Sequence, residues 1–342
     1  MLSLLPVLKV FAQSIDLPNT YGRALRLSFN ELQKISRRNK FGSVVLETAY
    51  KIRSIEEEDV PQVMELRRKL RVHDVPTYLL SWMKIDPEGI KVALNENGDV
   101  IGTISFVRNN SDLYVGGLYA MHEKYRGLSI GNRLFTVGLA HAQNKNIVGN
   151  PVPYMADKYI QMKLGHLDES FQTLKNFIPD FVNSNVLSNK ELPDNVEIEP
   201  YQECLLPSIV QYDTSIVGFD REQILELSCK EKNSQTFVAL KNGTCVGYGS
   251  IKLSCLDAGK VGPLFADDPG VAEALLKKLL ESYPNRKGFA MTTINTNDVA
   301  NSFVRKLGNA EIDTCLRFYT KVMLKVDTKR IFALTDLNFS AL

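Results

Sequence analysis

The hydrophobic and polar positions along the chain predict a series of strands and helices that occurs twice. Strict alternation indicates half-buried strands, and apolar residues spaced three to four positions apart indicate amphipathic helices. In the first half these patterns predict, in order, a strand at 50–53, helices at 54–71 and 76–82, strands at 90–94, 100–108 and 113–121, a helix at 127–143, a strand at 147–149 and a helix at 156–164. We therefore expect the first half to form a mixed sheet flanked by helices.

The second half shows nearly the same order of elements, although its residues hardly match those of the first. The patterns predict strands at 196–198, 236–240, 246–253, 260–265, 289–293 and 316–323, and helices that begin near 204, 220, 269 and 298. Between the halves, residues 183–195 are rich in Asn, Ser, Pro and Asp, which is typical of a linker. Two similar cores in tandem explain this pattern more simply than one large core.

The pattern divides the chain into five expected regions. They are a basic N-terminal extension at 1–48, a first domain at 49–185, a linker at 186–195, a second domain at 196–326 and a C-terminal tail at 327–342. Residues 1–45 carry seven Lys and Arg against two acidic residues, a bias shared with organelle transit peptides. Two interpretations stay open: a cytoplasmic protein whose extension packs on the domain or moves freely, or a mitochondrial protein targeted by that extension.

Composition and charge exclude several classes of function. With 342 residues, 44% hydrophobic and 23% charged, the chain has ordinary globular composition and is long enough for two cores. A net charge of +2 gives no case for a nucleic-acid partner or a membrane surface, and the apolar residues 1–12 are too short and interrupted to span a bilayer. The five cysteines form no C-x-x-C pair and the four histidines show no ligand spacing. We therefore expect a reduced intracellular protein without disulfides or a metal site.

One short segment has recognisable chemistry, and it lies between the strand at 113–121 and the helix that follows. Its sequence is RGLSIGN, residues 126–132. Two bridged phosphates need several converging N–H donors with no side chain in the way, and a helix N-terminus preceded by small residues supplies them. Gly127 and Gly131 let the backbone approach closely, Ser129 is small, and Arg126 adds positive charge. The alternative is an ordinary strand-to-helix turn, in which the glycines only allow the backbone to turn and bind no anion.

The run LYAMHEKYRGLSIGNRL at 118–134 resembles the signature of the GNAT superfamily, the acetyl-CoA-dependent N-acetyltransferases. Ser129 stands where the middle glycine of that signature usually lies. The resemblance covers about residues 50–170, because the order of elements agrees and KLGH at 163–166 is similar to the family's closing Lys-Leu-Gly-Phe. The whole chain resembles a two-domain GNAT group of largely unassigned substrate. This implies an α/β (α+β mixed sheet) fold of tandem GNAT-like domains, each a mostly antiparallel twisted sheet flanked by helices.

The resemblance also implies an activity and a set of contacts. A primary amine, on a small molecule or a peptide, would attack the thioester of acetyl-CoA directly, and the protein would be a monomer or a homodimer. Acetyl-CoA would be the co-substrate and no metal would take part. The implied contacts with the cofactor are Tyr119, Ala120, Met121, Arg126, Gly127, Leu128, Ser129, Ile130, Gly131 and Asn132.

The catalytic positions depart from the family pattern. Many members use a tyrosine as the acid that protonates the leaving thiolate, and the matching position here is Gln161. Tyr159 is the candidate acid and Tyr154 a second candidate, with the alternative that either ring simply packs. The strand at 113–121 holds no carboxylate that could serve as a base, so water or His122 would take the proton. A second interpretation therefore stays open, namely a non-catalytic protein that binds acyl-CoA or has a regulatory role. A third interpretation, a purely structural module, does not explain why the loop has Arg126 and two glycines before a helix.

The matching turn of the second half has different chemistry. Asp268 precedes Pro269, which predicts a helix whose first N–H groups are already capped by a carboxylate. Asp267 adds a second negative charge that repels phosphate. We therefore expect the second half to have the same fold but to leave the cofactor to the first.

Overall fold

The computed structural model describes residues 33–35, 48–188 and 192–342. The N-terminal extension expected at 1–48 lies outside these residues, apart from 33–35 and Thr48, and so does part of the expected linker. The first half comprises β1 (Gln33–Ile35), β2 (Thr48–Ser54), α2 (Val60–Lys69), α3 (Pro76–Ile85), β3 (Ile90–Asn95), β4 (Val100–Arg108), β5 (Leu113–Met121), α4 (Ile130–His141), β6 (Asn146–Gly149), α5 (Pro153–Gln161) and β7 (His166–Ile178). This order follows the predicted one, except that the hydrophobic pattern had predicted no strand where β1 or β7 lies.

The second half repeats the arrangement. It comprises β8 (Val196–Pro200), α6 (Leu206–Val217), α7 (Glu222–Cys229), β9 (Ser234–Lys241), β10 (Thr244–Leu253), β11 (Ala258–Ala266), α8 (Pro269–Glu281), β12 (Gly288–Ile294), α9 (Asp298–Leu307), β13 (Glu311–Tyr319) and β14 (Ile331–Ala333). Helices α2, α3, α5, α6 and α8 all have a proline in their first turn, where a missing backbone N–H costs nothing. The last long strand, β13, begins and ends earlier than the strand expected at 316–323.

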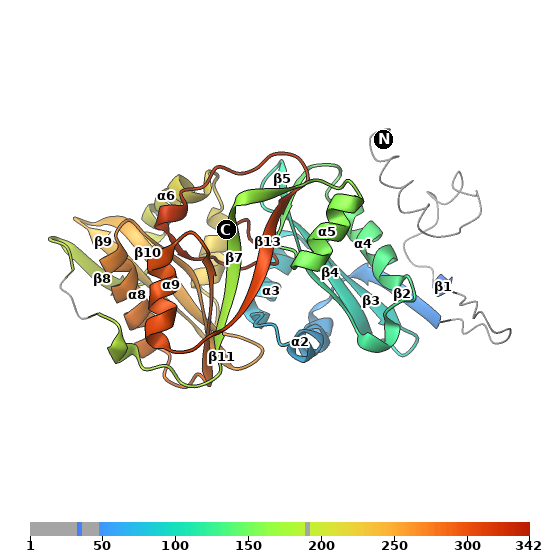
Figure 1. Cartoon of the computed structure of the whole chain (residues 1–342), viewed down its shortest axis with the longest axis horizontal. Helices are drawn as coiled ribbons and strands as arrows, with labels where there is room; N and C mark the ends of the chain where they lie inside the picture. The colour runs from blue at the N-terminus through green and yellow to red at the C-terminus, as the bar shows by residue number, and fades with distance from the viewer. Residues whose placement is uncertain (1–32, 36–47, 189–191) are drawn as a thin grey trace.

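One continuous sheet runs through both halves. Its strand order is β1-β2-β3-β4-β5-β6-β13-β7-β12-β11-β10-β9-β8, and β14 pairs with β11. The pairs β5–β6 and β11–β12 are parallel and occupy matching places in the two halves. Figure 1 shows the halves side by side, with β7 and β13 running between them.

The two halves exchange their last strands. β7 comes from the first half but pairs with β12 of the second, and β13 comes from the second half but pairs with β6 of the first. The boundary at 186–195 stays a prediction, but the strand pairing adds that residues 311–319 complete the sheet of the first half and residues 166–178 that of the second. Sequence patterns report the local period of a strand and not its partner, so they could not show the exchange.

Helices cover both faces of the sheet in each half. In the first half, α2 and α3 pack on one face with Val92 and Val115, and α4 packs on the other with Ile104 and Phe106. In the second half, α8 and α9 cover one face and α6 and α7 the other. Alternate residues of each strand enter opposite cores, as the pleat requires.

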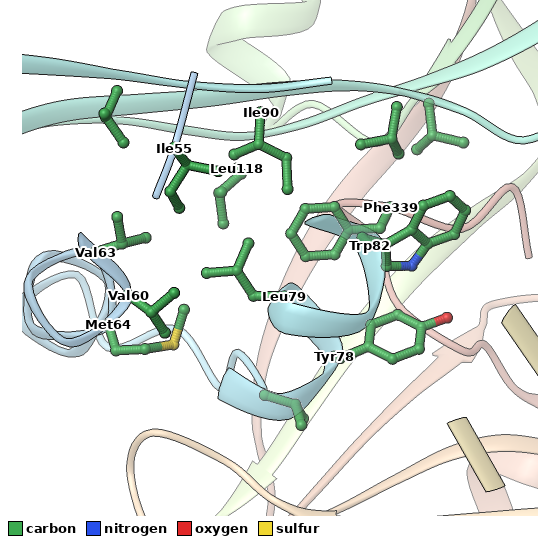
Figure 2. Close-up of a cluster of buried hydrophobic side chains, with 14 of the residues drawn as sticks. Ile55, Val60, Val63, Met64, Tyr78, Leu79, Trp82, Ile90, Leu118 and Phe339 are labelled. Atoms are coloured by element: carbon green, nitrogen blue, oxygen red, sulfur yellow. The ribbon is translucent and has the colours of Figure 1, made fainter. Parts of the chain in front are cut away.

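The C-terminal residues form part of the core. Phe339 stacks on Trp82 with ring centroids 6.3 Å apart and meets Tyr78 edge-on, inside the apolar cluster of α2 and α3 shown in Figure 2. Ala341 and Leu342 are also buried. The tail expected at 327–342 is thus mostly a buried segment packed between the halves.

None of the helices in the described ranges 48–188 and 192–342 is long and apolar enough to cross a bilayer.

Candidate functional site

The loop between β5 and α4 presents free backbone N–H groups. Gly127 has φ +73° and Ser129 has φ +62°, and both values lie in the left-handed region that favours glycine. This geometry turns the chain sharply, and the hydroxyl of Ser129 does not cap the helix it precedes. Because no side chain caps α4, the N–H groups of its first turn are available to an anion.

The matching turn of the second half is closed. The carboxylate of Asp268 accepts hydrogen bonds from the backbone N–H groups of Gly270 at 2.7 Å and Val271 at 3.2 Å. Asp267 accepts hydrogen bonds from Tyr212 and from the guanidinium of Arg330. The capped helix expected from the sequence is present. The N-terminus of α8 therefore has fewer free backbone N–H groups for an anion than the N-terminus of α4.

The loop opens into a cavity of about 1340 Å³. The cavity begins where the parallel strands β5 and β6 end their pairing, at Gly116 and Gly149. Eight of the ten residues expected to contact the cofactor line it: Tyr119, Ala120, Met121, Arg126, Gly127, Ser129, Gly131 and Asn132. Of the remaining two, Ile130 is fully buried and Leu128 packs against the same apolar core, so the structure does not place their side chains toward a ligand.

Two further features fix the shape of the loop. The Nε of Arg126 donates to the carbonyl of Met121 at 3.1 Å, which holds the guanidinium at the rim of the cavity. A Cβ on Gly131 would lie 2.6 Å from the hydroxyl of Tyr119, so only glycine fits there without displacing that ring.

Four tyrosines line the cavity near the loop, and they include both candidate acids. Tyr159 is half-buried between Phe135 and Phe318, whose ring centroids lie 5.7 and 5.6 Å from its own. Burial, with smaller contributions from Tyr119 and Tyr154, raises the pKa of Tyr159 well above its ordinary value. Its hydroxyl therefore stays protonated at neutral pH and can donate a proton or a hydrogen bond into the cavity. Tyr154 is largely exposed, at 73% of its full area.

His122 lies in a different environment from the one expected of a base. Its Nδ1 accepts the backbone N–H of Lys124 at 3.3 Å, and its ring packs edge-on against Tyr125. His122 is not among the residues that line the cavity. The structure therefore shows His122 capping a short turn outside the cavity lining, and its role as the base stays a prediction.

The inner part of the cavity lies between the two halves. It is lined by residues from the loop after α2, from the exchanged strands β7 and β13, from β11 and β12, and by Asn338. Asn338 accepts the N–H of Leu118 at 2.9 Å and donates to Asp74 at 2.8 Å. Leu118 itself has φ +53° within an irregular stretch of β5, so a C-terminal side chain holds the strand at this irregularity.

Sequence reasoning missed this inner part altogether. His73, Lys175 and Asn338 line it, yet the first drew no attention because it lacked metal-ligand spacing, and the others carried no local signal. Their positions are far apart in the chain, so only the fold brings them together. No group of His, Cys, Asp and Glu able to hold a metal occurs among the residues with described positions.

Two family models match the chain. One described as the acetyltransferase (GNAT) family matches residues 50–150, and one described as an acetyltransferase (GNAT) domain matches residues 209–333. The chain belongs to the GNAT superfamily. Its two GNAT domains lie in tandem, which confirms the resemblance and the fold class predicted from the sequence. GNAT domains indicate acyl transfer from acyl-CoA.

Solved structures agree with this fold. A protein from Pyrococcus horikoshii described as an acetyltransferase is 16% identical, with a TM-score of 0.65 over 85% of this chain and 96% of its own. A tandem GNAT protein from the clavulanic acid biosynthesis pathway is 11% identical, with a TM-score of 0.54 over 79% of this chain and 98% of its own. A GCN5-related N-acetyltransferase from Sphaerobacter thermophilus is 12% identical, with a TM-score of 0.54 over 85% and 98%. At these identities the likeness shows the fold alone, and no curated protein matches the sequence.

Proposed function

We propose that this GNAT protein is an N-acetyltransferase that transfers the acetyl group of acetyl-CoA to a primary amine, and that only its first domain binds the cofactor. The observation that supports this most directly is the contrast between the two matching helices. The N-terminus of α4 is uncapped and opens into the large cavity, whereas the N-terminus of α8 is occupied by Asp268. A diphosphate fits the first arrangement and is repelled by the second.

The remaining residues of the outer cavity fit the other parts of the cofactor. Arg126 at the rim supplies a positive charge for a phosphate. Beyond Gly116 and Gly149, the widening gap between β5 and β6 leaves room for an extended chain leading inward from the loop. The thioester would then lie near Tyr159, in the part of the cavity that both domains enclose.

The chemistry proposed is direct attack. A neutral amine adds to the thioester carbonyl, the tetrahedral intermediate collapses, and the carbon–sulfur bond breaks. The departing sulfur needs a proton, and the protonated hydroxyl of Tyr159 can donate it. No carboxylate lies on β5 to remove the proton of the amine, so water in the cavity takes it.

One assay separates this proposal from its alternative, a protein that binds acyl-CoA without turning it over. Purified protein is incubated with acetyl-CoA and a panel of polyamines, arylalkylamines, amino acids and peptide N-termini, and free thiol is measured. Release above the hydrolysis background with at least one amine supports the enzyme. Tight binding of acetyl-CoA by calorimetry without thiol release from any amine would establish the binding protein instead.

A further inference from the structure

One hydrogen-bonding group that lines the inner part of the cavity is the imidazole of His73. This half-buried ring packs against Phe177 with ring centroids 4.1 Å apart and a tilt of 39° between the ring planes. Its Nδ1 lies 3.1 Å from the hydroxyl of Ser254. The same hydroxyl oxygen accepts the backbone N–H groups of Leu256 at 3.3 Å and Ala258 at 3.2 Å.

This arrangement decides which nitrogen of His73 has the proton. A hydroxyl oxygen has two lone pairs, and two amide N–H groups already occupy them at Ser254. The hydroxyl hydrogen must therefore point to Nδ1 of His73, which accepts it. A neutral imidazole with an accepting Nδ1 has its proton on Nε2.

The Nε2–H of His73 is available to a ligand. Within the described residues it has no hydrogen-bond partner, and it is not one of the fully enclosed unpaired atoms. Burial, together with the nearby charges of Lys260, Lys175 and Arg71, lowers the pKa of His73 to about 4, and Asp74 opposes this shift. At neutral pH the ring is therefore a hydrogen-bond donor and not a base.

The charges around His73 favour an anion. Four cationic and three acidic side chains line the inner cavity: Arg67, Arg71, Lys175 and Lys260, and Asp74, Glu311 and Asp313. The innermost carboxylate, Asp74, is fully engaged by Arg67 and Asn338. Lys260 is paired with Asp336, which lies behind it at 2.8 Å.

The cations nearer the surface are only weakly neutralised. Lys175 is 29% exposed and its partner Asp313 is 78% exposed, with 3.2 Å between their charged atoms. Arg71 and Glu311 are 3.9 Å apart and both mostly exposed. Exposed ion pairs contribute little, so a carboxylate entering the cavity can replace Asp313 or Glu311 at small cost.

We propose that the inner cavity binds a carboxylate of the acceptor, held by the Nε2–H of His73 and the ammonium of Lys175, so that the acceptor amine is an amino acid or a peptide with a nearby carboxylate. This inference rests on the proposed acetyl transfer, because it places the carboxylate on the far side of the thioester from the CoA loop. It also gives the second domain a role, since Lys175 and its partner Asp313 lie on the two exchanged strands.

The test uses the full chain with CoA bound and needs no turnover. Each of the twenty N-acetyl amino acids is compared with its C-terminal amide, and binding is followed by the carbon-13 signal of the histidine rings. The chain has four histidines, and His73→Phe, which keeps an aromatic ring against Phe177, assigns the signal. At least one carboxylate should bind about tenfold more tightly than its amide and shift the His73 signal.

Two lysine variants provide the matched comparison. Lys175→Met should remove most of the preference for the carboxylate, and Lys84→Met, an exposed lysine on α3 away from the cavity, should not. If no N-acetyl amino acid shifts the His73 signal more than its amide does, the inference is wrong. If thiol is released only with amines that lack a carboxylate, this result would also refute the inference while it supports acetyl transfer. Carboxylate binding without thiol release would support the inference and refute the transfer.

Discussion

Ser129 offers the sharpest test of where the cofactor binds. Its side chain is exposed at the uncapped N-terminus of α4, and its backbone has φ +62°, which Asn and Asp tolerate better than most residues. Ser129→Asp would place a carboxylate where the proposal places a diphosphate. Ser129→Asn is the matched control, because it has nearly the same shape, tolerates the same backbone and has no charge.

The expected effect follows from Coulomb's law. Two unit charges about 5 Å apart repel by about 0.8 kcal/mol in water and about 3 kcal/mol at an effective dielectric constant of 20. The site is exposed, so the lower value applies to each of two phosphates, and the sum of about 1.6 kcal/mol raises Kd about 15-fold. The stability of the fold should not decrease, because a negative charge at the N-terminus of a helix interacts favourably with the helix dipole.

Calorimetry with CoA measures this directly. Ser129→Asp should bind more weakly than Ser129→Asn, and the difference should shrink in high salt because the repulsion is screened. Asp268→Asn in the second domain should leave both the affinity and a stoichiometry of one unchanged. Equal affinities of Ser129→Asp and Ser129→Asn would refute the assignment of the diphosphate to this loop.

Three further predictions concern other parts of the cavity. Tyr159→Phe should lower kcat by about 100-fold with no change in CoA affinity, because it removes only the proton donor; an unchanged rate would leave the ring a packing role. Asn338→Ala should lower the free energy of unfolding by about 3 kcal/mol in urea titrations, because the N–H of Leu118 and the carboxylate of Asp74 lose a buried partner; an unchanged midpoint would contradict this. Histidine in the unfolded chain is protonated below about pH 6.5, whereas His73 in the folded protein stays neutral down to about pH 4. The free energy of unfolding should therefore fall by at most about 3 kcal/mol as the pH drops from about 6.5 to about 4. His73→Phe should remove this part of the pH dependence.

The sequence alone determined the features whose cause is local. The turn at 126–132 forms because Gly127 and a small residue at 129 permit left-handed backbone, and the closed turn of α8 forms because Asp268 and Pro269 are adjacent. The hydrophobic periods that distinguish strands from helices are likewise set by residues only a few positions apart in the sequence. These signals were enough to predict the family, the repeated order of elements and most of the loop residues that line the cavity.

Tertiary structure decided what depends on partners far apart in the chain. The exchange of β7 and β13 is a choice between possible neighbours for strands whose alternation looks the same in either place. The hydroxyl of Ser105 meets the backbone of Asn338, 233 positions away, and His73 meets Ser254 across 181 positions. Such contacts leave no local pattern, because they depend on how the two halves of the continuous sheet are joined. The proposed cofactor loop could therefore be found from the sequence, whereas the inner cavity between the domains could not.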